Sequence, residues 1–395
     1  MTDRTLFLAG LLTAIASGAS GQSPPVGPTD SLPTPTGPYA VGTRDYSWID
    51  TARPELYTTA PGDHRQVLVQ IWYPAEPGTG ATPAPYLVNP ATVRDTTVAK
   101  AGAARRSHSF LDAPVADAAR RYPVLLYNHG GGWARWSASF TTEAMASHGY
   151  VVVSVEHPGF SQTGGFLDGT RFEPDTLGFP TPGGDLETDA LAGWAYLEDP
   201  VFRFWVADAR FVLDRLERLD EAPGPFQGRL DLSRIGAFGW SFGGATAVEL
   251  TRVDPRVKVA VDQDGQLFGE VRKGTERPVL LMHHGLDDAL GLPEAQRPAM
   301  RKLIEQVRRG DSTVRANSTG PWYELTVDGT QHGHFSDLIA FYPRGATQLD
   351  PDTGFAIINA YTLAFFDHYL LGKPAELLTA ESPPFPAATL RVWRR

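Results

Sequence analysis

Residues 234–250 read RIGAFGWSFGGATAVEL and combine a strand pattern, a sharp turn and a helical pattern. The apolar run at 235–238 predicts a buried strand, and a helical pattern begins after Gly243. Between them lies a Gly-x-Ser-x-Gly sequence at 239–243, in which small residues let a serine occupy a sharp strand-to-helix turn. We therefore predict Ser241 to be a catalytic nucleophile. The alternative interpretation is an ordinary glycine-rich β–α turn.

Strand-like apolar runs alternate with helical patterns along the chain. Besides 234–239, strands are predicted at 67–73, 123–128, 150–155, 257–261, 278–282 and, as the last of the series, 322–327. Helices are predicted at 140–147, 205–219, 242–250, 298–307 and 355–371. This alternation predicts an α/β fold with a mostly parallel central sheet and helices on both faces. The Gly- and Pro-rich stretch 160–200 lacks a clear period, so we expect an inserted loop or lid there.

Composition excludes several classes of protein. The 395 residues include 35 Lys+Arg and 45 Asp+Glu, which gives a net charge of −10 and argues against binding to nucleic-acid phosphates. The absence of Cys excludes disulfides, thiolate metal sites and a cysteine nucleophile.

The N-terminus has the layout of an export signal. Arg4 precedes an apolar run at 6–15 and small residues follow it, which predicts a signal peptide over 1–21 and a secreted or periplasmic protein. A disordered or anchored N-terminus is the alternative. We expect a Pro-rich linker over 22–36 and one folded domain over 37–395.

A second glycine-rich turn follows the strand predicted at 123–128. Residues 128–133 read NHGGGW, and glycines allow backbone N–H groups to approach a developing oxyanion closely. We predict the amides of Phe242 and Gly131 as the oxyanion hole, with the two flanking glycines as alternatives to Gly131. His129 is expected to order this loop. A flexible turn without a role is the alternative.

A serine nucleophile needs a histidine to take its proton and a carboxylate to orient that histidine. In this type of fold the chain order is serine, acid, histidine. The histidine candidates are His332 and His334, in QHGHFSD at 331–337. The acid candidates are Asp264, which lies 23 residues after Ser241 beyond the strand at 257–261, the pair Asp287 and Asp288 beyond the next strand, and Asp262 nearer its own strand.

These residues resemble the platelet-activating factor acetylhydrolase family, isoform II type. The resemblance runs from about residue 37 to 371, and its motifs are GPYAVG (37–42), QIWYPA (70–75), HG (129–130), SHGY (147–150), VEH (155–157) and GWSFGGAT (239–246). It implies an α/β-hydrolase fold and a triad of Ser241, Asp264 and His332, with Asp288 as the alternative acid. It also implies no metal or cofactor, and cleavage of phospholipid esters with short or oxidised acyl groups.

The sequence departs from the family pattern at two positions. Gly131 stands where a larger residue is usual, and Trp240 where a histidine is common, so we expect a reshaped acyl pocket. Trp133 and Trp240, together with Trp136 and the 160–200 stretch, are predicted to line an apolar cleft for the substrate, core packing being the alternative.

The resemblance thus implies the activity of a 1-alkyl-2-acetylglycerophosphocholine esterase-like enzyme. The alternatives are a broad-specificity lipase or polyester hydrolase, and a non-catalytic binding protein on a hydrolase fold. We expect a small or lipid ester as substrate, transient contact with a lipid surface, no nucleic acid and no stable protein partner.

Overall fold

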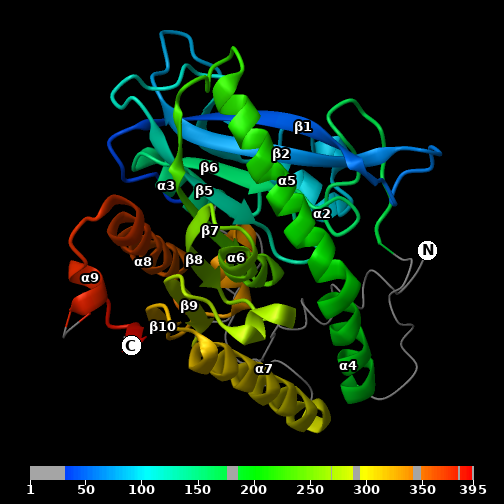
Figure 1. The fold of residues 1–395 in the computed structure, drawn as a ribbon, viewed down its shortest axis with the longest axis vertical. Coiled ribbons are helices and arrows are strands. Elements are labelled where there is room, and N and C mark those ends of the chain that lie inside the picture. The colour runs from blue at the N-terminus through cyan, green and yellow to red at the C-terminus, as the bar shows by residue number, and fades with distance from the viewer. Residues whose placement is uncertain are drawn as a thin grey trace.

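The computed structural model describes residues 32–175, 186–267, 269–287, 294–340, 348–380 and 383–393. Across these ranges the strands form one eleven-stranded sheet in the order β11-β10-β9-β8-β7-β5-β6-β2-β1-β4-β3 (Figure 1). The strands are β1 (Ala40–Pro54), β2 (His64–Ala75), β3 (Pro83–Pro85), β4 (Arg106–Leu111), β5 (Tyr122–Asn128), β6 (Val151–Val155), β7 (Leu230–Trp240), β8 (Val257–Gln263), β9 (Val279–His284), β10 (Trp322–Val327) and β11 (Ala388–Trp393).

The middle of the sheet is parallel. β5 pairs with β6 and β7, and parallel pairing continues through β8 and β9 to β10. Antiparallel strands extend this core, with β2 and β1 on one side and β11 on the other. The predicted mostly parallel sheet is confirmed. Because parallel strands end at the same edge of a sheet, the segments that follow β5, β7, β8, β9 and β10 converge there.

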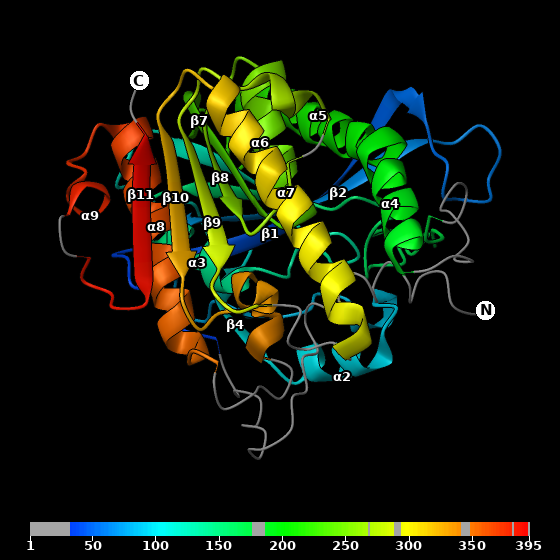
Figure 2. The same ribbon diagram turned by 90° about the horizontal axis from the view of Figure 1, so that it is seen from below.

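Helices cover both faces of the sheet. They are α2 (Thr96–Ala103), α3 (Ser139–Ser147), α4 (Leu186–Tyr196), α5 (Phe202–Glu221), α6 (Phe242–Val253), α7 (Arg297–Asn317), α8 (Pro351–Leu371) and α9 (Glu376–Thr379). Leu125 and Tyr127 of β5 join an apolar core with α3 and α8, whereas Val124 and Leu126 join another with α5, α6 and α7. This alternation follows from the two-residue period of a strand. Figure 2 shows the two layers of helices on opposite sides of the sheet.

The continuous apolar runs identified the central elements. All seven predicted strands are present, as β2 and β5 to β10, and all five predicted helices as α3 and α5 to α8. The prediction that 322–327 ends the series of strands is wrong, because β11 follows and pairs with β10. β1 and β11 carry many exposed or half-buried residues, so neither gives the unbroken apolar signal of a strand covered on both faces.

The 160–200 stretch is more structured than the expected loop. Its first part packs Phe160, Phe166 and Phe172 into an aromatic core against α5. Its last part contains α4 and a π-helical turn at Leu197–Val201 that leads directly into α5. Helix α4 has no one-sided apolar pattern that a sequence reading could detect.

The start of the chain falls largely outside the described residues. The predicted signal peptide and most of the predicted linker lie outside the residues that the structure describes. Packing nevertheless begins inside that linker, since Leu32 is buried and its carbonyl lies 3.0 Å from Nε2 of His108. Within the described parts of the chain, no helix combines the length and the apolar character needed to cross a bilayer.

Candidate active site

Ser241 lies at the turn between β7 and α6, where it caps the N-terminus of the helix. Its backbone angles are φ 57° and ψ −123°, a conformation that is strained for a residue other than glycine. A Cβ at Gly239 would overlap the backbone of Gly243, and one at Gly243 would overlap the carbonyl of Asn128. The two glycines of the motif are thus required by the close approach of β5, β7 and α6.

Asp264 follows β8 and also has a positive φ, 62°. Its Oδ2 accepts a hydrogen bond of 2.7 Å from Nδ1 of His332. Burial by itself would raise the pKa of this carboxyl, but the imidazoles of His284 and His332 beside it hold its pKa well below the usual value. Asp264 is therefore an ionised carboxylate that fixes the orientation of His332.

The competing acids are placed differently. Asp288 lies outside the described residues. Asp287 is partly exposed and pairs with Arg301 at 3.0 Å. Asp262 is buried, and burial raises its pKa well above the usual value. Its Oδ1 accepts a hydrogen bond of 2.6 Å from Gly265 N–H, so it braces the turn that presents Asp264.

His332 begins a short 3₁₀ turn, His332–Phe335, after β10. Nδ1 faces Asp264, which leaves Nε2 to exchange a proton with a nucleophile. His334 is held in the loop instead, because its Nδ1 accepts from Gln331 N–H at 3.0 Å and its Nε2 donates to the Leu349 carbonyl at 3.1 Å. Of the two histidine candidates, His332 is the one that the structure joins to an acid.

Two hydrogen bonds, one between backbone groups and one from a side chain, bring these segments together. The Ser241 N–H donates to the Gln263 carbonyl at 2.9 Å, next to the turn that carries Asp264. Trp240 Nε1 donates to the His332 carbonyl at 3.0 Å. The turns that carry the predicted serine, acid and histidine thus lie together at the carboxyl edge of the sheet.

His284 was not predicted for this site. It ends β9, its Nδ1 lies 2.6 Å from Oδ2 of Asp264, and its backbone N–H donates to Oδ1 at 3.0 Å. The available signal was its position, since a polar residue at the end of the strand beside β8 must lie near the residue that follows β8. Its role could not be inferred from the sequence without knowing that β8 pairs with β9.

Asp264, His284 and His332 have the donor types of a transition-metal site, and the donor atoms lie within 4.8 Å of one another. The distances from the two Nδ1 atoms to Oδ2, 2.6 and 2.7 Å, are those of N–H···O hydrogen bonds. Ligand atoms around a tetrahedral zinc ion are about 3.3 Å apart for bonds of about 2.0–2.1 Å. Each Nδ1 therefore carries a proton here.

The glycine loop after β5 narrows the choice of oxyanion donors. The amide of Gly132 is already engaged, since it donates to the Phe160 carbonyl at 3.0 Å. Gly130 packs on the ring of Trp240, where a Cβ would clash. Gly131 lies between them. Phe242 is the first residue of α6, so its amide lies at the positive end of the helix dipole.

His129 is fully buried beneath this loop. Its Nδ1–H donates to the Gly130 carbonyl at 2.7 Å, and its Nε2 accepts from His157 N–H at 3.2 Å. Burial lowers the pKa of His129 to about 4. A neutral imidazole with both nitrogens engaged is a structural support of the loop, as the sequence suggested.

The predicted tryptophans are mostly buried. Trp240 is 2% exposed and lies between the glycine loop and the His332 loop, and Trp133 is 7% exposed, with ring centroids 6.2 Å apart. Trp136 is buried against Tyr86. The three rings therefore belong to the buried apolar core on this side of the sheet, and contact of Trp133 and Trp240 with a substrate stays a prediction.

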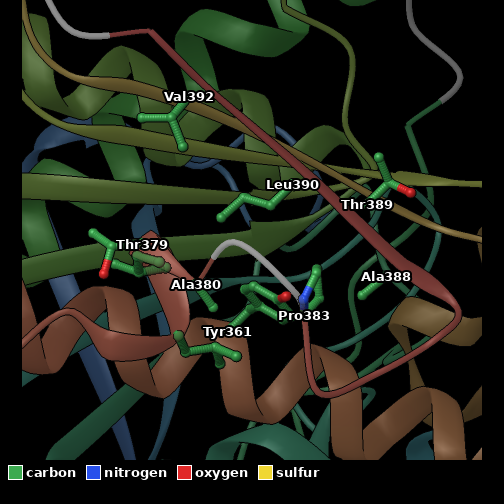
Figure 3. Close-up of a pocket in the computed structure, with 10 residues that line it drawn as sticks. Tyr361, Thr379, Ala380, Pro383, Ala388, Thr389, Leu390 and Val392 are labelled. Atoms are coloured by element: carbon green, nitrogen blue, oxygen red, sulfur yellow. The ribbon is translucent and has the colours of Figure 1, made fainter.

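A hollow of about 470 Å³ opens beside Asp264 and His332. It is lined by the turns after β8 and β9 and by α7, including His284, Asp287, Arg301, Arg308 and Asp311. A larger hollow of about 640 Å³ lies between α8, the α9 region and β11, and none of its ten lining residues is a predicted site residue (Figure 3). The first hollow is therefore the one that adjoins the candidate site.

A mostly parallel sheet with a serine at a strand–helix turn, and an acid and a histidine after later strands, defines an α/β-hydrolase. The ferulic acid esterase from Streptomyces cinnamoneus has the same fold, with a TM-score of 0.69 and 27% sequence identity over 91% of this chain and 99% of that chain. The predicted α/β-hydrolase fold is confirmed.

The family model of platelet-activating factor acetylhydrolase, isoform II, matches residues 26–166. A probable 1-alkyl-2-acetylglycerophosphocholine esterase of Arthroderma benhamiae is 24% identical over 67% of this chain, and the platelet-activating factor acetylhydrolase of Cavia porcellus 25% over 63%. The matches span 65% and 58% of those relatives' own lengths. The resemblance inferred from the motifs is thus confirmed.

Proposed function

We propose that the chain is a serine hydrolase that cleaves carboxylic esters through an acyl-enzyme. One observation carries the proposal: the 2.7 Å hydrogen bond between Asp264 and His332, in a site that also contains a strained serine at a strand–helix turn. This arrangement matches the requirements of a Ser-His-Asp triad. The esterase relatives and the esterase structure support the same class of reaction.

In the first step, Oγ of Ser241 attacks the ester carbonyl while Nε2 of His332 takes the hydroxyl proton. Asp264 stabilises the imidazolium that forms. The amides of Gly131 and Phe242 bind the oxyanion, and a donor of this kind contributes roughly 3–4 kcal/mol to lowering the barrier. His332 then gives the proton to the leaving alkoxide, which departs as an alcohol.

In the second step, water attacks the acyl-serine and His332 takes one of its protons. Collapse of the second tetrahedral intermediate releases the carboxylic acid, and the proton returns to Oγ of Ser241. Every group needed is a side chain or a backbone amide of this chain, so the proposed mechanism includes no metal or cofactor.

The proposed substrate is a short-acyl phospholipid ester, with a broad-specificity esterase or lipase as the second candidate. The named relatives support the first. The second is supported by the ferulic acid esterase, which this chain matches over more of its length. Hydrolysis rates for an sn-2-acetyl phospholipid, a feruloyl ester and a long-chain triglyceride separate the two, and the first candidate requires the phospholipid to have the highest kcat/KM.

The test of the catalytic serine is Ser241→Ala with p-nitrophenyl acetate as substrate. Turnover should fall to the level without enzyme, and labelling by a fluorophosphonate should disappear. Ser312→Ala, at an exposed position of α7, is the matched control and should leave both unchanged. Retained turnover or labelling in the Ser241 variant would contradict the assignment.

We further propose that the protein is exported. Arg4 and the apolar run at 6–15 support this. Expression of the full chain in a bacterial host, followed by N-terminal sequencing of periplasmic protein, should give a start near residue 22. Full-length protein confined to the cytoplasm would oppose the proposal.

A further inference from the structure

The carboxylate of Asp264 binds more than the one histidine that a triad uses. Oδ2 accepts from Nδ1 of both His332 and His284, at 2.7 and 2.6 Å, and Oδ1 accepts from the backbone N–H of His284 at 3.0 Å. His284 therefore holds both oxygens, whereas His332 contacts one. This places the orientation of the carboxylate under the control of a residue outside the proposed triad.

The fold fixes the position of His284 independently of His332. His284 ends β9, which is paired in parallel with β8 on one side and β10 on the other. The Asp264 N–H also donates to the Met282 carbonyl at 3.0 Å, which joins the turn after β8 to β9. His332, in contrast, lies on a short turn beyond β10. The imidazole that contacts both the side-chain oxygen and, through its backbone, the second oxygen of the acid thus comes from a strand of the central sheet, whereas His332 comes from a turn.

Oδ2 of Asp264 is shared by two Nδ1–H donors, so the loss of either donor leaves the carboxylate less constrained. The side chain of His284 is 18% exposed and lines the hollow beside the site. The other ionisable groups of that hollow are His283 of β9, Asp287 of the following turn, and Arg301, Glu305, Arg308 and Asp311 of α7.

We propose that His284 is a positioning residue of the hydrolytic reaction, which fixes the carboxylate of Asp264 in the orientation that His332 uses. The proposal rests on the proposed function. His284 exchanges no proton with the substrate in this scheme. Its Nδ1–H keeps Oδ2 where Nδ1 of His332 can reach it.

The test compares His284→Leu with His284→Asn. Leucine removes the side-chain donor, and kcat should fall about 10-fold or more with little change in KM, as expected for losing one hydrogen bond to a charged group. The amide NH₂ of asparagine stands near the position of Nδ1, so kcat should stay within about threefold of wild type.

His64→Leu, at an exposed position at the start of β2, is the control and should behave as wild type. Wild-type kcat in the leucine variant would overturn the proposal. Equal losses in the leucine and asparagine variants would also overturn it, because the donor would then not be the relevant feature. Turnover by Ser241→Ala would instead refute the proposed function itself, so the two failures are distinguishable.

A measurement on the wild-type protein keeps the proposal testable if the leucine variant does not fold. Proton NMR should show two far-downfield imidazole N–H signals, one each from His284 and His332, and the asparagine variant should lose one of them. A single downfield signal in wild type that survives His284→Asn would overturn the proposal.

Discussion

Ser241 and Asp264 share a feature that ordinary turn residues avoid. Both are non-glycine residues with positive φ, 57° and 62°. Such conformations persist only where the surrounding structure compensates for the strain, and they cluster at functional sites. Here the compensation is visible, because Gly265 fits against the Ser241 carbonyl and the Asp262 carboxylate without room for a Cβ.

At the residue scale, Asp264→Asn should nearly abolish activity without unfolding the protein. The amide cannot stabilise an imidazolium and favours the wrong tautomer of His332, so kcat should fall on the order of 10³–10⁴-fold. Hydrolysis of p-nitrophenyl acetate measures the loss, and circular dichroism checks the fold. Asp287→Asn changes a partly exposed carboxylate paired with Arg301 and should keep most of the activity. A larger loss of activity in Asp287→Asn than in Asp264→Asn would instead assign the triad acid to the turn after β9.

The site residues differ in how far sequence alone could identify them. Ser241 was identifiable because its chemistry and its strand–turn–helix setting lie in one contiguous stretch. Choosing Asp264 over its neighbours required the family resemblance, since several turns at this edge of the sheet carry an aspartate. His284 was missed because its role depends on the pairing of β8 with β9, a long-range contact that no local pattern contains.

At the scale of elements, the loop that carries His332 is hydrogen-bonded to the N-terminus of α3. Asp337 accepts hydrogen bonds from Ser139 N–H and Phe140 N–H, at 2.8 and 3.1 Å, so a residue just after the His332 turn caps the N-terminus of α3. Tyr86 O–H donates to the same carboxylate at 2.8 Å. The cap ties the loop that carries His332 to the helical layer on one face of the sheet.

Asp337→Ala should therefore lower both stability and activity. Losing an N-cap costs about 0.5–2 kcal/mol, and buried donors left without an acceptor add to that cost. The free energy of unfolding, measured in urea, should fall by about 2 kcal/mol or more. We expect kcat to fall as well, because His332 loses an anchor. Asp350→Ala, which removes the exposed cap of α8, is the comparison, and it should lower stability but leave kcat unchanged.

The glycine loop makes stability depend on pH through His129. Its pKa is about 4 in the folded protein, below about 6.5 for an unfolded chain. Between these two pKa values the unfolded state binds more protons than the folded state. The contribution of His129 to the free energy of unfolding is therefore fully present above about pH 6.5. It decreases by about 3 kcal/mol in total as the pH falls toward 4. His129→Gln should flatten this decrease in urea unfolding measured from pH 7 to 4.5. An unchanged slope in the variant would assign the effect to other groups.

At the scale of the whole molecule, buried ion pairs and hydrogen bonds to one carboxylate connect the antiparallel and parallel parts of the sheet. Arg65 of β2 binds Asp208 of α5 through two hydrogen bonds, at 3.1 and 2.7 Å, and both side chains are almost fully buried. His157, after β6, contacts the same carboxylate at 3.1 Å. These contacts hold α5 against β2 and against the segment that follows β6.

The central strands of the sheet were easier to predict from the sequence than the strands at its edges. Strands buried on both faces are continuous apolar runs, so β5 to β10 could be identified from sequence. The edge strand β11 carries exposed residues on its outer side and follows a proline-rich segment, and it gave no comparable signal. The buried ion pair could not be foreseen, because Arg65 and Asp208 are 143 residues apart.

Asp208→Asn tests whether this pair supports the molecule as a whole. Removing one charge leaves Arg65 buried without its main counterion, which costs about 3–5 kcal/mol. Glu305→Gln is the contrast, because it breaks an exposed pair with Arg309 on α7 that is worth less than about 1 kcal/mol. Urea unfolding should show a large fall in midpoint for the first variant and almost none for the second. Similar midpoints in both would mean that solvent reaches Arg65, contrary to its burial in the structure.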